Sequence, residues 1–128
     1  KTVEDLMLVG KKIPFVNEKL RMTAALKNIE KRKLGTLIVL NNKKFTTGIL
    51  TDGDLKRVSN LSTNLNSLQI KEVMKKNPVS VDKNILAVEA LSIMNTKKIT
   101  SLCVHQNNKK NKTIGFIHIH DILDANIN

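Results

Sequence analysis

A short motif near the middle of the chain carries residue types suited to holding a phosphate and a sugar. It reads Gly48-Ile-Leu-Thr-Asp-Gly-Asp54, and the basic residues Lys56 and Arg57 follow it. Thr51 and Asp54 are three residues apart where an extended segment gives way to a helix, so both side chains face the helix start. Unpaired backbone N–H groups there attract anions, and a carboxylate can accept hydrogen bonds from a ribose diol. Thr51, Asp54 and Arg57 are therefore candidate ligand-binding residues.

The same spacing also has a purely structural interpretation. A threonine followed three residues later by an acid is a capping box, which satisfies backbone N–H groups at a helix start. A second copy reads Gly115-Phe-Ile-His-Ile-His-Asp121, in which His118 replaces the threonine and Asp121 keeps the acid. Because histidine is a poorer cap, the retained acid slightly favours ligand contact over capping. We therefore add His118 and Asp121 to the candidate ligand-binding residues.

Small polar residues open two apolar segments of strand length. Thr36 follows Gly35 in the first segment, and Ser101 follows Thr100 in the second. Such residues could approach a ligand base through backbone contacts, or they could be ordinary turn residues. Thr36 and Ser101 are candidates on this basis. His105 ends the second segment beside a polar turn, and we expect it to be solvated.

Metal binding and catalysis find little support in the sequence. His118, His120 and Asp121 are too few ligands for a typical metal site. Cys103 is the only cysteine and lies within Leu-Cys-Val, which indicates a buried, unreactive thiol in a reducing compartment and excludes a disulfide framework. The chain contains neither G-x-x-x-x-G-K-[ST] nor G-x-G-x-x-G. We expect neither a metal site nor a catalytic residue in these residues.

The net charge suggests nucleic-acid binding, but the scarcity of arginine and aromatic residues argues against it. The 128 residues include 22 basic and 11 acidic ones, which gives a formal net charge of +11. Only Arg21, Arg32 and Arg57 are arginines, the residue that reads guanine, and aromatic residues are just 2%, which leaves no stacking platform. No apolar run approaches the roughly 20 residues that cross a bilayer. We expect neither a nucleic acid nor a membrane as partner.

Blocks of sequence recur about 65 residues apart and in the same order. The matching blocks are Leu6-Met7 with Val73-Met74, Pro14 with Pro78, Ala25-Leu26 with Ala90-Leu91, Leu34–Val39 with Ile99–Val104, and Gly48–Leu55 with Gly115–Ile122. Chance matching would not keep both order and spacing over so many blocks. The chain therefore divides into a repeat at residues 1–59, a linker at 60–69 and a second repeat at 70–128.

The hydrophobic pattern predicts the element order α-β-α-β-β-α in each repeat. In the second repeat, apolar residues at helical spacing follow Asn84, which is a plausible N-cap. A unit of under 60 residues buries little surface alone. We therefore expect an α/β (α+β) fold in which two repeats pack with pseudo-two-fold symmetry, with small-molecule clefts between them.

The repeat and its motif resemble a pair of cystathionine-β-synthase (CBS) domains, and the resemblance covers essentially the whole chain. Four blocks are similar to the C-terminal CBS pair of bacterial arabinose-5-phosphate isomerases. They are Thr51–Arg57, Leu86–Leu91, Ile99–Leu102 and His118–Leu123. The resemblance implies a parent enzyme that interconverts ribulose 5-phosphate and arabinose 5-phosphate for the Kdo sugar of lipopolysaccharide or capsule, in the cytoplasm of a Gram-negative bacterium.

The resemblance also implies partners and ligands. In the isomerases the catalytic residues lie in an N-terminal sugar-isomerase (SIS) domain, so we expect Lys1 to follow that domain and this chain to be inactive alone. In CBS pairs the threonine and aspartate of the motif commonly contact adenine nucleotides, which names Thr51, Asp54 and, by position, Asp121; His118 departs from the pattern. No cofactor is required, and the implied effectors are AMP, ADP, ATP or CMP-Kdo. A homodimer of CBS pairs and a tetrameric parent are also implied.

Three functions remain open at this point. The first is a regulatory module that senses a nucleotide or nucleotide-sugar. The second is a structural module that binds no ligand and only holds an oligomer together, which would require an apolar face for a second copy. The third and weakest is nucleic-acid binding driven by net charge, which would fall steeply with salt.

Overall fold

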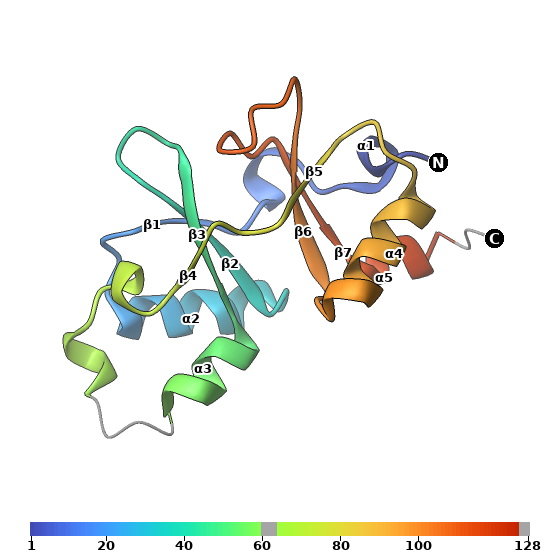
Figure 1. Cartoon of the computed structure of the whole chain (residues 1–128). Coiled ribbons are helices and arrows are strands. Elements are labelled where there is room, and N and C mark those ends of the chain that lie inside the picture. The colour runs from blue at the N-terminus through green and yellow to red at the C-terminus, as the bar shows by residue number, and fades with distance from the viewer. Residues whose placement is uncertain (60–63, 126–128) are drawn as a thin grey trace. The chain divides into compact units, whose positions relative to one another are not determined.

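The computed structural model describes residues 1–59 and 64–125, which form two compact units (Figure 1). The middle unit comprises Pro14–Pro78, and the terminal unit comprises Lys1–Ile13 together with Val79–Asn128. These units do not coincide with the sequence repeats, because the segment before each proline joins the other repeat's unit. Within the expected linker, residues 60–63 lie outside the described residues, whereas Leu65 and Leu68 contact the core of the middle unit.

The middle unit is built on a four-stranded sheet in the order β1-β2-β3-β4. The strands are β1 Phe15–Asn17, β2 Thr36–Leu40, β3 Thr46–Thr51 and β4 Lys75–Lys76. Strand β1 runs parallel to β2, which requires a crossover, and helix α2 (Met22–Arg32) provides it. Strands β3 and β4 are antiparallel to their neighbours.

Helix α2 covers this sheet with one apolar face. Met22, Ala25 and Ile29 lie at helical spacing and are buried against strand residues such as Leu37 and Leu50. Helix α3 (Asp52–Ser59) follows β3 without a loop. Two 3₁₀ turns, Leu65–Ser67 and Ile70–Glu72, precede β4. The motif singled out in the sequence therefore lies at the junction of β3 and α3.

The terminal unit repeats this plan with a three-stranded sheet in the order β5-β6-β7. Its elements are α1 Val3–Leu6, a 3₁₀ turn at Gly10–Lys12, β5 Ser80–Asp82, α4 Ala87–Lys97, β6 Ser101–His105, β7 Gly115–His118 and α5 Ile119–Leu123. Strand β5 is parallel to β6, and β7 is antiparallel to it. None of the described helices has the length and hydropathy needed to cross a membrane.

Matching positions in the two units share unusual local features. Helices α2 and α4 both end at a lysine with positive φ, Lys33 at 57° and Lys98 at 56°. The predicted mixed α/β repeat is confirmed, with two local differences. The first helix expected in the second repeat is the 3₁₀ turn Ile70–Glu72. The N-cap of α4 is Leu86 and not Asn84, whose N–H instead donates to Asp82 Oδ1 at 2.8 Å.

Candidate ligand-binding site

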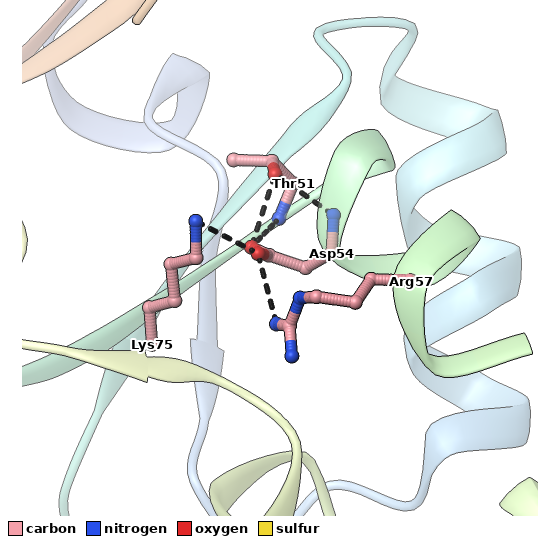
Figure 2. A network of polar contacts seen from close by, with 4 residues as sticks. All are labelled: Thr51, Asp54, Arg57 and Lys75. Carbon is pink, nitrogen blue, oxygen red and sulfur yellow. Dashed lines mark hydrogen bonds and ion pairs between the residues drawn. The ribbon is translucent and has the colours of Figure 1, made fainter. Parts of the chain in front are cut away.

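Thr51 and Asp54 form a complete capping box where β3 passes into α3 (Figure 2). The backbone N–H of Thr51 donates to Asp54 Oδ2 at 2.9 Å, and the Thr51 hydroxyl donates to the same oxygen at 3.0 Å. The backbone N–H of Asp54 donates to Thr51 Oγ1 at 3.3 Å. The capping interpretation of this spacing is therefore realised in the structure.

Two cations converge on the other oxygen of the same carboxylate. Arg57 Nη2 lies 3.2 Å from Asp54 Oδ1, and Lys75 Nζ lies 3.3 Å from it (Figure 2). Asp54 is 1% exposed, whereas the side chains of Arg57 and Lys75 are 57% and 65% exposed. The carboxylate is thus buried beneath two cations that remain accessible to solvent. We call Thr51, Asp54, Arg57 and Lys75 the Asp54 cluster.

The electrostatics of the cluster keep Asp54 ionised. Burial alone favours the neutral carboxyl and raises its pKa. Hydrogen bonds from Thr51 and Arg57, with the charge of Lys75, act in the opposite direction and hold the pKa of Asp54 below its ordinary value of 3.8. At neutral pH the cluster therefore combines one negative and two positive side chains, which leaves a net positive charge suited to an anion.

Two glycines allow the backbone to assemble this cluster. Gly35 has a φ of +69°, and its carbonyl accepts the N–H of Asp52 at 3.0 Å, so β2 and the start of α3 are joined. Gly48 lies in β3 opposite β4, where an added Cβ would collide with the side chain of Met74 and come within 2.8 Å of the Lys75 carbonyl oxygen. Because Gly48 has no side chain, β4 can pack close to β3, and this places Lys75 within reach of Asp54.

Thr36 lies beside the cluster in the sheet. It is the first residue of β2 and pairs directly with Thr51 of β3, and it is 3% exposed. The structure therefore brings Thr36, Thr51, Asp54 and Arg57 to one end of the middle unit's sheet. Lys75 was missed in the sequence because it lies 21 positions beyond Asp54 and outside any motif. The glycine opposite the Met74 segment was the available signal for this contact.

The terminal unit has a matching but differently charged arrangement. His118 N–H donates to Asp121 Oδ2 at 2.9 Å, and His118 Nδ1 accepts the N–H of His120 at 3.1 Å. The rings of His118 and His120 stack with their centroids 4.9 Å apart. Burial and the charge of His120 lower the pKa of His118, and the negative charge of Asp121 acts in the opposite direction. Ser101 is 6% exposed and pairs with His118, as Thr36 pairs with Thr51.

Capping explains why the acid is retained in the second copy. Asp121 satisfies the N–H of His118 although histidine replaces the threonine. The same hydrogen bond, from a backbone N–H to the carboxylate three residues later, is present at the start of three other helical turns. The accepting carboxylates belong to Asp5, Glu72 and Glu89, and their oxygens lie 2.9, 2.8 and 3.2 Å from the donating nitrogens. The retained acid therefore does not favour ligand contact over capping, contrary to the inference from the sequence.

Two further residues have clear environments. Cys103 is 1% exposed, and burial raises the pKa of its thiol to about 12, against a weak opposing hydrogen bond from Thr113. The expectation of a buried thiol is confirmed, and its low reactivity stays a prediction. The expectation that His105 is solvated is wrong, because it is 3% exposed. Its ring Nδ1 lies 2.6 Å from Ser80 Oγ, since the parallel pairing of β5 and β6 brings the two strands together.

Metal-binding side chains do not gather in the described parts of the chain. Among residues 1–59 and 64–125, no three His, Cys, Asp or Glu side chains form a group that could hold an ion. The geometry that remains for ligand chemistry is the Asp54 cluster, which offers two accessible cations, a threonine hydroxyl and a buried carboxylate.

The CBS-domain family model matches residues 3–60 and again residues 70–128. Arabinose 5-phosphate isomerase KdsD of Yersinia pestis is 35% identical over 125 residues, which cover 98% of this chain and 37% of that protein. KdsD of Salmonella typhimurium is 36% identical with the same coverage. The chain therefore spans little more than a third of the length of these relatives.

Solved structures share the fold at lower identity. CBSX2 in complex with AMP matches with a TM-score of 0.84 and 21% identity, over 97% of this chain and 94% of that one. The CBS-domain protein ATU1752 from Agrobacterium tumefaciens matches with a TM-score of 0.84 and 23% identity, over 98% and 93% of the two chains. These likenesses concern the fold alone.

Proposed function

Because this chain belongs to the CBS-domain family, as a tandem pair, we propose that it is the regulatory, ligand-binding part of an arabinose-5-phosphate isomerase. The observation that carries the proposal is the 35% identity to such an isomerase across 98% of the chain. In this proposal the sugar-phosphate chemistry belongs to an SIS domain outside these residues. The parent interconverts ribulose 5-phosphate and arabinose 5-phosphate in the cytoplasm for lipopolysaccharide or capsule synthesis.

The proposed effector is an adenine nucleotide or CMP-Kdo, bound at the Asp54 cluster. Support comes from its chemistry, because Arg57 and Lys75 are cations that can meet a phosphate and Asp54 is a carboxylate that can accept ribose hydroxyls. A CBS pair of the same fold has been solved with AMP. Binding would regulate the isomerase by as much free energy as the ligand discriminates between two states of the module.

A thermal-melt screen of the 128-residue chain tests this proposal. The ligands are AMP, ADP, ATP, CMP, CMP-Kdo and arabinose 5-phosphate. A ligand at about 100 times its Kd adds roughly 2.7 kcal/mol to the free energy of unfolding. For a chain of this size that raises the Tm by roughly 5–10 °C. Unchanged melting with every ligand at millimolar concentration would contradict the sensing role.

Titration calorimetry of Asp54→Ala then tests the site. We expect a weakened affinity for whichever nucleotide shifts the melt, because the carboxylate that holds both cations and faces the sugar is gone. The matched control is Asp121→Ala, which removes the equivalent acid of the terminal unit. An affinity untouched by Asp54→Ala would remove Asp54 from the binding site and would leave the sensing role to other residues.

A second candidate function, assembly without a ligand, is favoured by one observation. Four large apolar side chains of the terminal unit are exposed in the described part of the chain. They are Val9, Leu86, Val88 and Leu123, each at least 45% exposed. A homodimer would cover such side chains. Size-exclusion chromatography with light scattering tests this, and a strictly monomeric chain over the accessible concentration range would argue against an assembly role.

A further inference from the structure

The two units differ in charge at positions that otherwise match. In the middle unit Lys75 pairs with Ile49, the residue after Gly48. In the terminal unit Leu8 forms an antiparallel β-bridge with Phe116, the residue after Gly115. Leu8 therefore occupies the place of Lys75. By the same repeat alignment, Asp124 occupies the place of Arg57, since each follows the capping acid by three residues. The cations of the Asp54 cluster have no basic counterpart at these positions of the terminal unit.

We propose that Lys75 and Arg57 form a phosphate-binding pair, held on Asp54 in the ligand-free chain, and that they make the middle unit the single anion-binding unit of this chain. The inference rests on the proposed function in taking the physiological ligand to be a phosphorylated nucleoside. It extends that function in naming Lys75, which lies outside the motif, as the residue that sets the number of sites and the requirement for phosphate.

The contacts of Asp54 explain how such a site works. Its Oδ2 is used by two bonds from Thr51 and its Oδ1 by Arg57 and Lys75, so the carboxylate has no capacity left for a sugar. A phosphate that draws both cations away from Oδ1 releases that oxygen to accept ribose hydroxyls. Phosphate and ribose binding are then coupled, because each requires the same exchange of partners.

Exposure and charge favour this exchange in the middle unit. The side chains of Arg57 and Lys75 are more than half exposed, so they can reorient toward a phosphate, and the ribose hydroxyls that replace them keep the buried Oδ1 of Asp54 hydrogen-bonded. The bonds of the two cations to a phosphate are charge-assisted on both sides. In the terminal unit Asp124 takes the place of Arg57 and repels a phosphate, and Leu8 offers no charge. We therefore expect one anion per chain.

Titration calorimetry of the 128-residue chain with AMP, adenosine and inorganic pyrophosphate tests the proposal. The decisive variant is Lys75→Met, and the matched control is Lys76→Met, whose side chain points to the opposite face of the same strand. We expect one AMP per chain and an affinity for AMP and pyrophosphate that falls about tenfold or more in Lys75→Met. Lys76→Met should stay within about twofold, and Lys75→Arg should retain most of the affinity. Adenosine carries no phosphate to draw the cations from Oδ1, so it should bind the parent chain and Lys76→Met equally weakly, and Lys75→Met should not weaken its binding further.

The outcomes separate this inference from the proposed function. Binding of AMP with equal affinity in Lys75→Met and Lys76→Met, or of two AMP molecules per chain, would overturn the inference and leave nucleotide sensing intact. Lys75-dependent binding of pyrophosphate without binding of any nucleotide would support the phosphate pair and contradict nucleotide sensing. A chain that binds none of the anions overturns the phosphate pair outright. Melting of each variant without ligand verifies that it is folded.

Discussion

Replacing Asp54 with alanine should lower the free energy of unfolding of the chain by about 2 kcal/mol. Loss of the cap at the start of α3 costs about 1 kcal/mol, since the N–H of Thr51 loses its acceptor. The ion pairs with Arg57 and Lys75 add a few tenths of a kcal/mol each, because both cations are more than half exposed and solvent screens them. The Thr51 hydroxyl also loses its acceptor at 3.0 Å.

Asp121→Ala is the matched control for this prediction. Asp121 makes the same capping bond, to the N–H of His118, but its counterparts of Arg57 and Lys75 are Asp124 and Leu8. Its loss should therefore cost about 1 kcal/mol, the value of the cap alone. Urea unfolding at neutral pH measures both variants. Equal losses for the two variants would refute the claim that the cations stabilise the middle unit through Asp54.

The cost of Asp54→Ala should also depend on pH. The pKa of Asp54 is held below its ordinary value of 3.8, so the unfolded chain binds a proton at higher pH than the folded chain. The stabilisation by Asp54 is therefore complete above the unfolded pKa and is lost as the pH falls through the folded one. The difference between parent and variant should shrink below about pH 4. A difference that stays constant from neutral pH to about pH 3 would contradict this.

Three more predictions follow from individual environments. Gly48→Ala should lower stability by about 1–3 kcal/mol and separate Lys75 from Asp54, because its Cβ would come within 2.8 Å of the Lys75 carbonyl oxygen; Gly53→Ala, with nothing nearer than 3.6 Å, should be nearly neutral in the same denaturation assay. Burial lowers the pKa of His105 below 6.5, aided by Lys110 and opposed by Asp82. The unfolded chain therefore binds a proton at this residue more readily than the folded chain, so stability should fall as the pH drops below about 6.5. His105→Gln should flatten that part of the Tm–pH profile. Cys103, with a pKa of about 12, should not react with a thiol reagent in the folded chain and should react on unfolding; rapid labelling of the native chain would contradict its burial.

The repeat and its elements could be predicted because they depend on the spacing of residues that are close together in the sequence. The helical spacing of Met22, Ala25 and Ile29 reflects which face is buried, and the structure buries those residues. The motif at Thr51 and Asp54 was recognisable because a capping box needs only residues three apart. Both signals involve interactions within a few residues, which sequence spacing determines directly.

The two errors have different causes. A polar turn follows His105 and suggests a solvated side chain, yet the parallel neighbour β5 places Ser80 against its ring. Local composition does not reveal which strand lies alongside, so it could not reveal this environment. The Asn84 error is local, because the N–H of Asn84 donates to the side chain of Asp82 two residues earlier and the helix begins only three residues later.

The sequence by itself determined the element order, the duplicated plan and the capping acids, because each depends on side-chain periodicity or on neighbours within one helical turn. Only the tertiary structure decided that residues 14–78 form one unit and that the first 13 residues join the other. It also decided that Lys75 reaches Asp54, since that contact depends on β4 pairing with β3 at Gly48. Strand pairing joins residues that are far apart in the sequence, so spacing alone does not reveal it. Here the pairing of β4 with β3 adds Lys75 to an ordinary helix cap, and the buried carboxylate of Asp54 then lies beneath two cations.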